Sequence, residues 1–238
     1  MKISRNAALK SHAFTMTELL IVIVIVIVLF ALFRPTNGRG RVKAQRIKCS
    51  SNLKQVALAF KVFAGDQDEK LPWEVYSARN PDGARQQVWQ YFQAISNELG
   101  SAKILMCPGD VVRQPNRSSD FTDGMDGLAN SNRQNLAVSY FLGTSVSSNQ
   151  PNAILVGDRN LSPDGTASLY TSRLAQPMMV ATNTIWNGEP GQAHHDNAGN
   201  YALADGSVQQ ASTARLQEAL TLARDSYGTN ANRFLFPQ

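Results

Sequence analysis

Two groups of residues in this sequence have types and spacings that could support chemistry. The first is His194, His195 and Asp196, which are adjacent, and an imidazole beside a carboxylate can bind a metal ion or act as a general base. The one other histidine in the chain is His12, near its start. Because a site with several histidines cannot be assembled, we interpret His195 first as a packed or hydrogen-bonded structural residue.

The second group is three carboxylates at three-residue steps. Asp120, Asp123 and Asp126 lie in the segment DFTDGMDG, which suits calcium weakly because it lacks the alternating ligands and distal glutamate of an EF-hand. The sequence has no HExxH pair, paired-cysteine zinc pattern, GxSxG turn or phosphate-binding loop. We therefore expect no catalytic residues, no enzyme activity and no cofactor, with calcium as the single weak candidate.

One apolar segment with a single charged residue dominates the sequence. Residues 14–33 read FTMTELLIVIVIVIVLFALF, and the fifteen from Leu19 onward carry no polar group. As a helix, twenty residues extend about 30 Å, the thickness of the hydrocarbon core of a bilayer. Glu18 is the fifth residue of the segment, and a carboxylate at membrane depth usually has a partner and a function. We expect a transmembrane helix over 14–33.

A short basic leader precedes this segment. Residues 1–13 contain three cations and no acid. A basic leader, a small residue, a phenylalanine and a glutamate at the fifth apolar position together resemble the N-terminal signal of type IV pilin-like proteins. The resemblance implies that prepilin peptidase cleaves between Ala13, where the family prefers glycine, and Phe14, and that it methylates the new N-terminus at Phe14.

The resemblance also assigns roles to Glu18 and Pro35. Glu18 matches the family glutamate that pairs with the Phe14 amine of a neighbouring subunit during assembly. Pro35 matches the proline that kinks the helix, and Gly38 and Gly40 further weaken a helix at this point. An ordinary signal anchor, or a cleaved signal peptide, is the alternative interpretation of the same segment.

Charge is distributed unevenly along the chain. Three of the 23 cations lie in the leader and eight lie between residues 34 and 61 without any acid, whereas the rest of the chain holds 12 cations and 17 acids. A basic stem followed by an acidic head differs from the clustered basic face of a nucleic-acid-binding protein, so we expect no nucleic-acid partner.

Orientation follows from the resemblance and not from charge. Six stem cations close to the anchor would place the head in the cytoplasm by the positive-inside rule. The leader of a prepilin is cytoplasmic, which instead places the head on the extracytoplasmic, periplasmic side of the cytoplasmic (inner) membrane. The stem cations then contact anionic headgroups or form a plain solvated helix face.

The remaining chain predicts an α+β fold with a long N-terminal helix and a head built on a small antiparallel sheet. Apolar residues recur at steps of three, four and seven from Val42 to Phe63, which predicts an amphipathic helix in a stem over 34–64. The head is then 65–238. Within it we expect a helix before Gly100, strands at 136–142, 153–156 and 178–186, a hairpin of 200–204 and 207–210, a short C-terminal helix and docking of 234–236.

The hairpin extends the resemblance to a particular group. His195, nine intervening residues and Asp205-Gly206 match the motif of the prepilin-type H-x9-DG proteins, and the segments CSSNLKQVALAF and MCPGD are similar to the stem and Cys-Pro loop of that group. We expect His195 to lie beside the turn at Asp205 and Gly206 and to donate a hydrogen bond that fastens the last hairpin.

Cys49 and Cys107 are the two cysteines of the chain. In the topology that the resemblance implies, both lie outside the cytoplasm, where disulfides form, and a bridge between them would join the stem to the connecting loop. Two buried thiols are the alternative.

These observations predict a structural subunit, a prepilin or pseudopilin of a type IV pilus or type II secretion pseudopilus. The implied partners are prepilin peptidase, other pilin or pseudopilin subunits and the cytoplasmic membrane. The competing prediction is a single-pass, membrane-anchored extracytoplasmic binding domain. An anchored hydrolase is weaker because no catalytic triad can be assembled.

Overall fold

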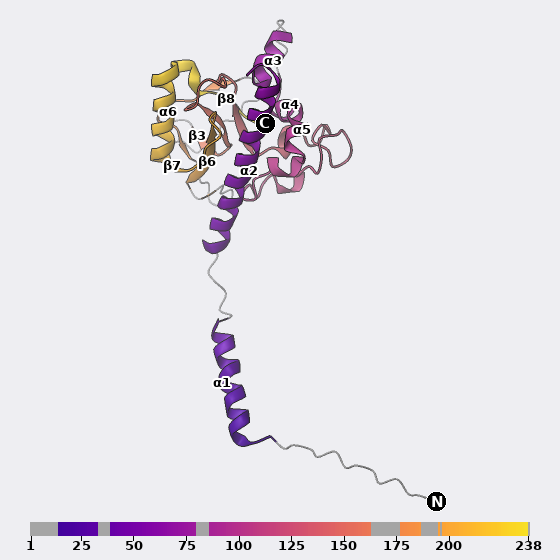
Figure 1. Cartoon of the computed structure of the whole chain (residues 1–238), viewed down its shortest axis with the longest axis vertical. Helices are drawn as coiled ribbons and strands as arrows, with labels where there is room; N and C mark the ends of the chain where they lie inside the picture. The colour runs from indigo at the N-terminus through magenta and orange to yellow at the C-terminus, as the bar shows by residue number, and fades with distance from the viewer. Residues whose placement is uncertain are drawn as a thin grey trace, which may run out of the picture. The chain divides into compact units, whose positions relative to one another are not determined.

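The chain consists of two compact units, Met1–Gly40 and Arg41–Gln238. A computed structural model describes residues 14–32, 39–79, 86–162, 177–186, 195 and 197–237. In the first unit, helix α1 (Met16–Leu32) carries the apolar segment (Figure 1). Its side chains from Leu19 to Phe30 are exposed. Within the described ranges, no helix is both long enough and apolar enough to cross a membrane.

Several predictions about the N-terminal region fall outside the described residues. These are the leader, the cleavage residue Ala13, and Pro35 with its expected kink. The expected long N-terminal helix is described as two separate elements, α1 and α2 (Arg39–Asp66).

Helix α2 buries the apolar stripe predicted from its periodicity. Cys49, Leu53, Val56 and Phe60 are fully buried, whereas Val42 near the start of the helix is exposed. Four aligned positions separated by three or four residues form one face of a helix, which explains why this segment is helical when it packs on the head.

Three short helices follow α2 and extend the same apolar core. The side chains of Val88, Phe92 and Ile95 are buried, and Gly100, the predicted helix stop, ends α5 in the left-handed region at φ 69°. The indole of Trp73 packs 5.7 Å from the ring of Phe60. The helices are α3 (Pro72–Arg79), α4 (Val88–Ala94) and α5 (Ser96–Leu99), followed by 3-10 turns η1 (Ala102–Leu105), η2 (Gln114–Asn116) and η3 (Gln134–Ala137).

Among the described residues, six strands form one antiparallel sheet in the order β4-β8-β1-β2-β6-β7, and two more form a small second sheet, β3-β5. This mixture of helices with an antiparallel sheet confirms the predicted α+β class. The strands are β1 (Tyr140–Gly143), β2 (Ile154–Asp158), β3 (Leu161–Ser162), β4 (Met178–Met179), β5 (Ile185–Trp186), β6 (Ala198–Leu203), β7 (Val208–Ser212) and β8 (Arg233–Leu235).

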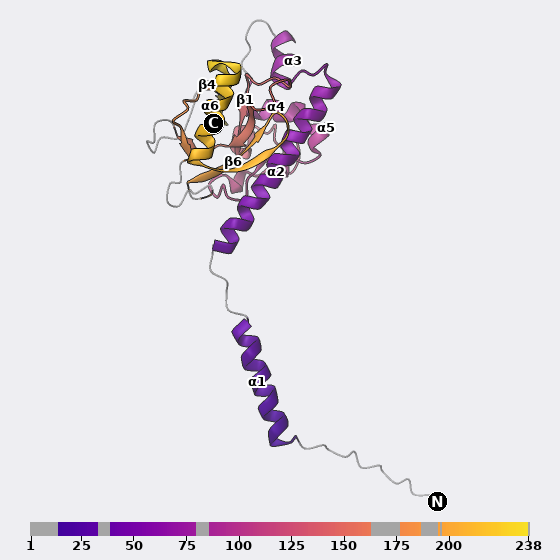
Figure 2. The same cartoon turned by 60° about the vertical axis from the view of Figure 1, so that its left-hand side comes forward.

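Successive side chains of the central strands point to opposite faces of the sheet. Tyr140 and Leu142 of β1 belong to the core shared with α2, whereas Phe141 between them packs in a second core with Leu216 and Leu220 of α6 (Thr213–Tyr227). Figure 2 shows α2 and α6 on opposite sides of the sheet. Because helices cover both faces, every residue of β1 and β2 is buried.

The last part of the head matches its prediction closely. Strands β6 and β7 form a hairpin around Asp205-Gly206, and Gly206 has φ 87°, a conformation that favours glycine. The tail after η5 (Thr229–Asn232) forms β8, and Phe234, Leu235 and Phe236 are buried there.

Candidate functional site

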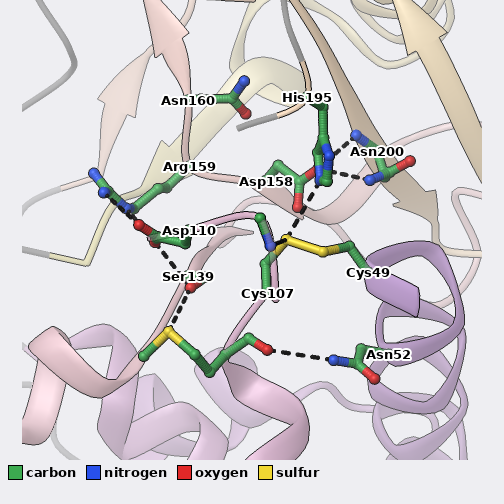
Figure 3. The surroundings of a disulfide bond; sticks show 12 residues. Cys49, Asn52, Cys107, Asp110, Ser139, Asp158, Arg159, Asn160, His195 and Asn200 are labelled. Atoms are coloured by element: carbon green, nitrogen blue, oxygen red, sulfur yellow. Dashed lines mark hydrogen bonds and ion pairs between the residues drawn. A yellow bond between two sulfur atoms is a disulfide. The ribbon is translucent and has the colours of Figure 1, made fainter. Parts of the chain in front are cut away.

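A disulfide joins Cys49 to Cys107 in the structure, one of the two alternatives that the sequence left open. Cys49 lies on the buried face of α2 and Cys107 lies in the loop after η1, with 5.1 Å between their Cα atoms (Figure 3). Closing a loop over a separation of 58 residues stabilises the fold by about 4 kcal/mol in the chain-entropy model. The bond therefore fastens the stem helix to the connecting loop.

His195 lies against this disulfide. Its Nε2 is 3.3 Å from Sγ of Cys107 and 3.5 Å from Oδ2 of Asp158, and its side chain is 1% exposed. The backbone of His195 has φ 57°, a left-handed conformation that is uncommon for a residue with a side chain. Gly109 permits the close approach, because a Cβ at that position would lie 2.9 Å from Cε1 of His195.

Asp158, at the end of β2, is the buried carboxylate beside His195. Its Oδ2 accepts hydrogen bonds from the backbone N and from Nδ2 of Asn200 in β6, both at 2.8 Å. Tyr140 is the partner of Asp158 in the β1–β2 register. Burial raises the pKa of Tyr140 well above its ordinary value, and the nearby carboxylates of Asp158 and Asp110 raise it further.

A second buried carboxylate belongs to Asp110, at the end of the Cys-Pro segment MCPGD. Arg159 donates to both of its oxygens, from Nε at 2.8 Å and from Nη2 at 3.0 Å, and Ser139 Oγ donates at 2.9 Å. Arg159 directly follows Asp158, so adjacent residues at the end of β2 contact Asp110 on one side and His195 on the other. A bidentate arginine–carboxylate pair fixes the orientation of the two side chains as well as the distance between them.

The turn at Asp205 and Gly206 does not receive the hydrogen bond predicted from His195. His195 precedes β6 and Asp205 follows it, and an extended strand keeps its two ends apart. Helix α2 fastens the turn instead: Nζ of Lys61 donates to the carbonyl of Asp205 at 2.9 Å, and Nζ of Lys54 donates to that of Gly206 at 2.6 Å. The predicted contact is absent because strand β6 lies between His195 and the turn and keeps them apart.

Two of the three aspartates considered for calcium have protein partners. Asp120 Oδ1 accepts from the backbone N and from Oγ1 of Thr122, and Asp126 pairs with Arg133. Within the residues that the structure describes, Asp120, Asp123 and Asp126 do not form a group close enough to share an ion. The geometry therefore gives no support to calcium in this loop.

Another group does converge in the described part of the chain. One ligand atom from each of Cys49, Cys107 and His195 lies within 4.8 Å of the other two, and all three residues are buried. His194 and Asp196, the neighbours considered with His195, lie outside the described residues.

Glu18 takes part in the N-terminal cap of α1. Its Oε2 accepts from the backbone N of Thr15 at 2.8 Å and from Thr15 Oγ1 at 2.9 Å, while its own backbone N donates to Thr15 Oγ1 at 3.3 Å. This is the reciprocal arrangement of a capping box, which satisfies backbone N–H groups that a helix start leaves without partners.

The sequence interpretation missed Asp158, Asn200 and the Asp110–Arg159 pair. The signal for Asp158 was a charged residue directly after the short apolar run 154–157, and Asp110 lies in the MCPGD segment itself. Such sequence patterns can indicate a buried polar residue, but they do not identify its hydrogen-bond or ion-pair partner. The pairing depends on the tertiary structure.

Comparison of the chain with protein-family models, with curated proteins and with solved structures gave no match in any of the three. Three features of the molecule bear on function: the capped apolar helix, the disulfide-linked stem helix and the buried cluster around His195.

Proposed function

We propose that this chain is a pilin-like structural subunit, a prepilin or pseudopilin that enters the cytoplasmic membrane and then assembles with other subunits through its apolar helix. One observation carries the proposal. Helix α1 exposes large apolar side chains all around its axis, while its one carboxylate, Glu18, is held at its first turn. A helix that is apolar all around is buried in its working state, so α1 requires lipid or other helices around it.

Processing supplies the partner for Glu18 in this proposal. Prepilin peptidase cleaves after Ala13 and methylates Phe14, which becomes the N-terminal residue. Phe14 directly precedes Thr15, whose N–H donates to Glu18 in the described cap. In the filament, Glu18 of one subunit pairs with the Phe14 amine of its neighbour, so a carboxylate that is costly in an apolar environment gains a cation only on assembly.

The second unit supports a role as the head on the surface of the filament. The stem helix α2 buries one face in the head, and Cys49–Cys107 links the two covalently. This bond holds the stem helix α2 against the head during extraction from the membrane. Disulfides persist in oxidising compartments, which supports an extracytoplasmic head.

The test separates the charge of Glu18 from its capping role. Glu18→Gln keeps the capping hydrogen bonds and removes the charge, whereas Thr15→Ala removes the two hydrogen bonds between Thr15 Oγ1 and Glu18 and keeps the charge. With prepilin peptidase and an assembly system present, we expect Glu18→Gln and Glu18→Ala to be processed and membrane-inserted but to be depleted at least tenfold from sheared filaments. Thr15→Ala should still assemble. Glu18→Gln present in filaments at the wild-type level would contradict the proposal.

A further inference from the structure

The cluster of Cys49, Cys107 and His195 combines two sulfurs and an imidazole in a fully buried place. Two cysteine thiolates and a histidine are ligands that zinc prefers, and structural zinc sites are buried and four-coordinate. In the oxidised chain the two sulfurs are bonded to each other and are not available to a metal ion. A newly made chain, however, carries both cysteines as thiols, so the reduced state comes first and needs no reductant.

The distances around His195 fit a shared ion. Ligand atoms on one tetrahedral zinc are roughly 3.3–3.8 Å apart, given bonds of about 2.3 Å to sulfur and 2.0 Å to nitrogen or oxygen. Nε2 of His195 is 3.3 Å from Sγ of Cys107 and 3.5 Å from Oδ2 of Asp158. The sulfur of Cys49 is held next to that of Cys107 by the bond that reduction removes, and the two can then separate.

Asp158 is not part of that converging group of three, and it becomes the fourth ligand only when the two sulfurs separate on reduction. Its side chain is buried and lies beside the imidazole (Figure 3). Asn200 donates two hydrogen bonds to Oδ2 of Asp158 and so fixes the carboxylate, which is the outer-shell support that metal ligands usually have.

We infer that the reduced chain binds one Zn²⁺ through Cys49, Cys107, His195 and Asp158, and that this site and the disulfide are alternative links between α2 and the Cys-Pro loop. Binding releases two thiol protons and changes no oxidation state. Disulfide formation by exchange with an external disulfide transfers two electrons to that disulfide, which becomes two thiols, and the ion leaves. The inference is independent of the pilin proposal, since it concerns the head alone.

The experiment compares two states of the same full-length chain in detergent. Protein reduced with a phosphine under anaerobic conditions and protein left oxidised are dialysed against Zn²⁺, and bound metal is measured by elemental analysis. We expect about one zinc per reduced chain and less than a tenth of that per oxidised chain. Co²⁺ in place of zinc should give thiolate charge-transfer absorption and the intense visible bands of a tetrahedral site.

Variants identify the remaining ligands. Asparagine tolerates a positive φ, so His195→Asn keeps the backbone and removes the imidazole, and Asp158→Asn removes the charged ligand. Each should weaken zinc binding by the reduced chain at least tenfold, whereas Asp123→Asn in the exposed loop should leave it unchanged.

Three results would overturn the inference. One is a reduced chain that keeps its near-ultraviolet circular dichroism and takes up no zinc. Another is equal zinc affinity in wild type and His195→Asn, because an unfolded chain binds through its thiols alone. The third is a reduced chain that unfolds and does not regain its circular dichroism when zinc is added.

Discussion

The imidazole of His195 lies 3.3 Å from the sulfur of Cys107, although 88 residues separate them in the chain. Two features that the sequence presents separately, the histidine of the H-x9-DG motif and the Cys-Pro loop, are therefore parts of one buried cluster. The cluster joins the stem helix, the loop after η1 and the start of β6. Cys49, Cys107 and His195 are all buried, so the cluster is part of the core of the head.

The fit between Gly109 and His195 leads to the first prediction. Gly109→Ala places a methyl group 2.9 Å from Cε1 of His195, so the ring or the loop must move, and we expect a loss of about 1–3 kcal/mol in unfolding free energy. Urea unfolding of the full-length chain in detergent measures it through tryptophan fluorescence, since all three tryptophans lie in the second unit.

A double-mutant cycle shows whether His195 causes that loss. In a His195→Ala background the methyl group has space, so Gly109→Ala should cost about 1 kcal/mol less than it does in the wild type. Equal losses in both backgrounds would mean that the effect of Gly109 comes from its own backbone and not from the imidazole.

The second prediction concerns the attachment of the Asp205-Gly206 turn to α2. Lys54→Met together with Lys61→Met removes the two donors to the turn and keeps apolar side chains of similar length, so we expect a loss of about 1–2 kcal/mol. Amide exchange should also become faster in the turn. Lys48→Met, on the exposed side of the same helix, is the control and should change stability by less than about 0.5 kcal/mol. A double variant as stable as that control would contradict the attachment.

The third prediction is a dependence on alkaline pH. The pKa of buried Tyr140 is raised well above its ordinary value, so above about pH 10 the unfolded chain releases this proton while the folded chain keeps it. The contribution of Tyr140 to the free energy of unfolding is therefore fully present below about pH 10. It is lost as the pH rises, by about 1.4 kcal/mol per pH unit for one such tyrosine.

Tyr140→Phe tests this contribution directly. Unfolding free energies measured between pH 8 and 11 should fall less steeply for Tyr140→Phe than for wild type, and the difference should emerge only above about pH 10. Some slope should remain, because burial also raises the pKa of Tyr91 to about 12. Parallel curves for the two proteins would show that Tyr140 titrates alike in the folded and unfolded chains.

Much of the fold was predictable because local patterns agree with the tertiary structure. The buried stripe Cys49–Phe60, the helix before Gly100 and the Asp-Gly hairpin each follow from a short-range period or a turn preference. The strand expected from residue 136 begins only at Tyr140. Residues 134–137 form the 3-10 turn η3 instead, and Arg113 donates hydrogen bonds to the carbonyls of Asn135 and Val138. No local sequence pattern predicts a hydrogen-bond partner so distant in the chain.

The site was predictable only in its residues. The sequence singled out His195, Cys107 and Asp205, yet it paired His195 with Asp205 because they are the two ends of the H-x9-DG match. The structure pairs His195 with Cys107 and Asp158, contacts that depend on how the sheet places β2 and β6 next to the Cys-Pro loop. The sequence interpretation considered Glu18 only as the partner of the Phe14 amine of a neighbouring subunit. It missed the local cap with Thr15, which the simple T-x-x-E pattern predicts.

The mass of the mature N-terminus tests the proposed function most directly. The full-length gene is expressed with prepilin peptidase, and the protein extracted from the membrane is analysed intact and by fragmentation. The proposal predicts a chain that begins with N-methylated Phe14. A chain that begins at Met1, or at a residue beyond Leu29, would contradict it, and a chain that begins at Met1 and stays in the membrane would favour an anchored binding domain instead.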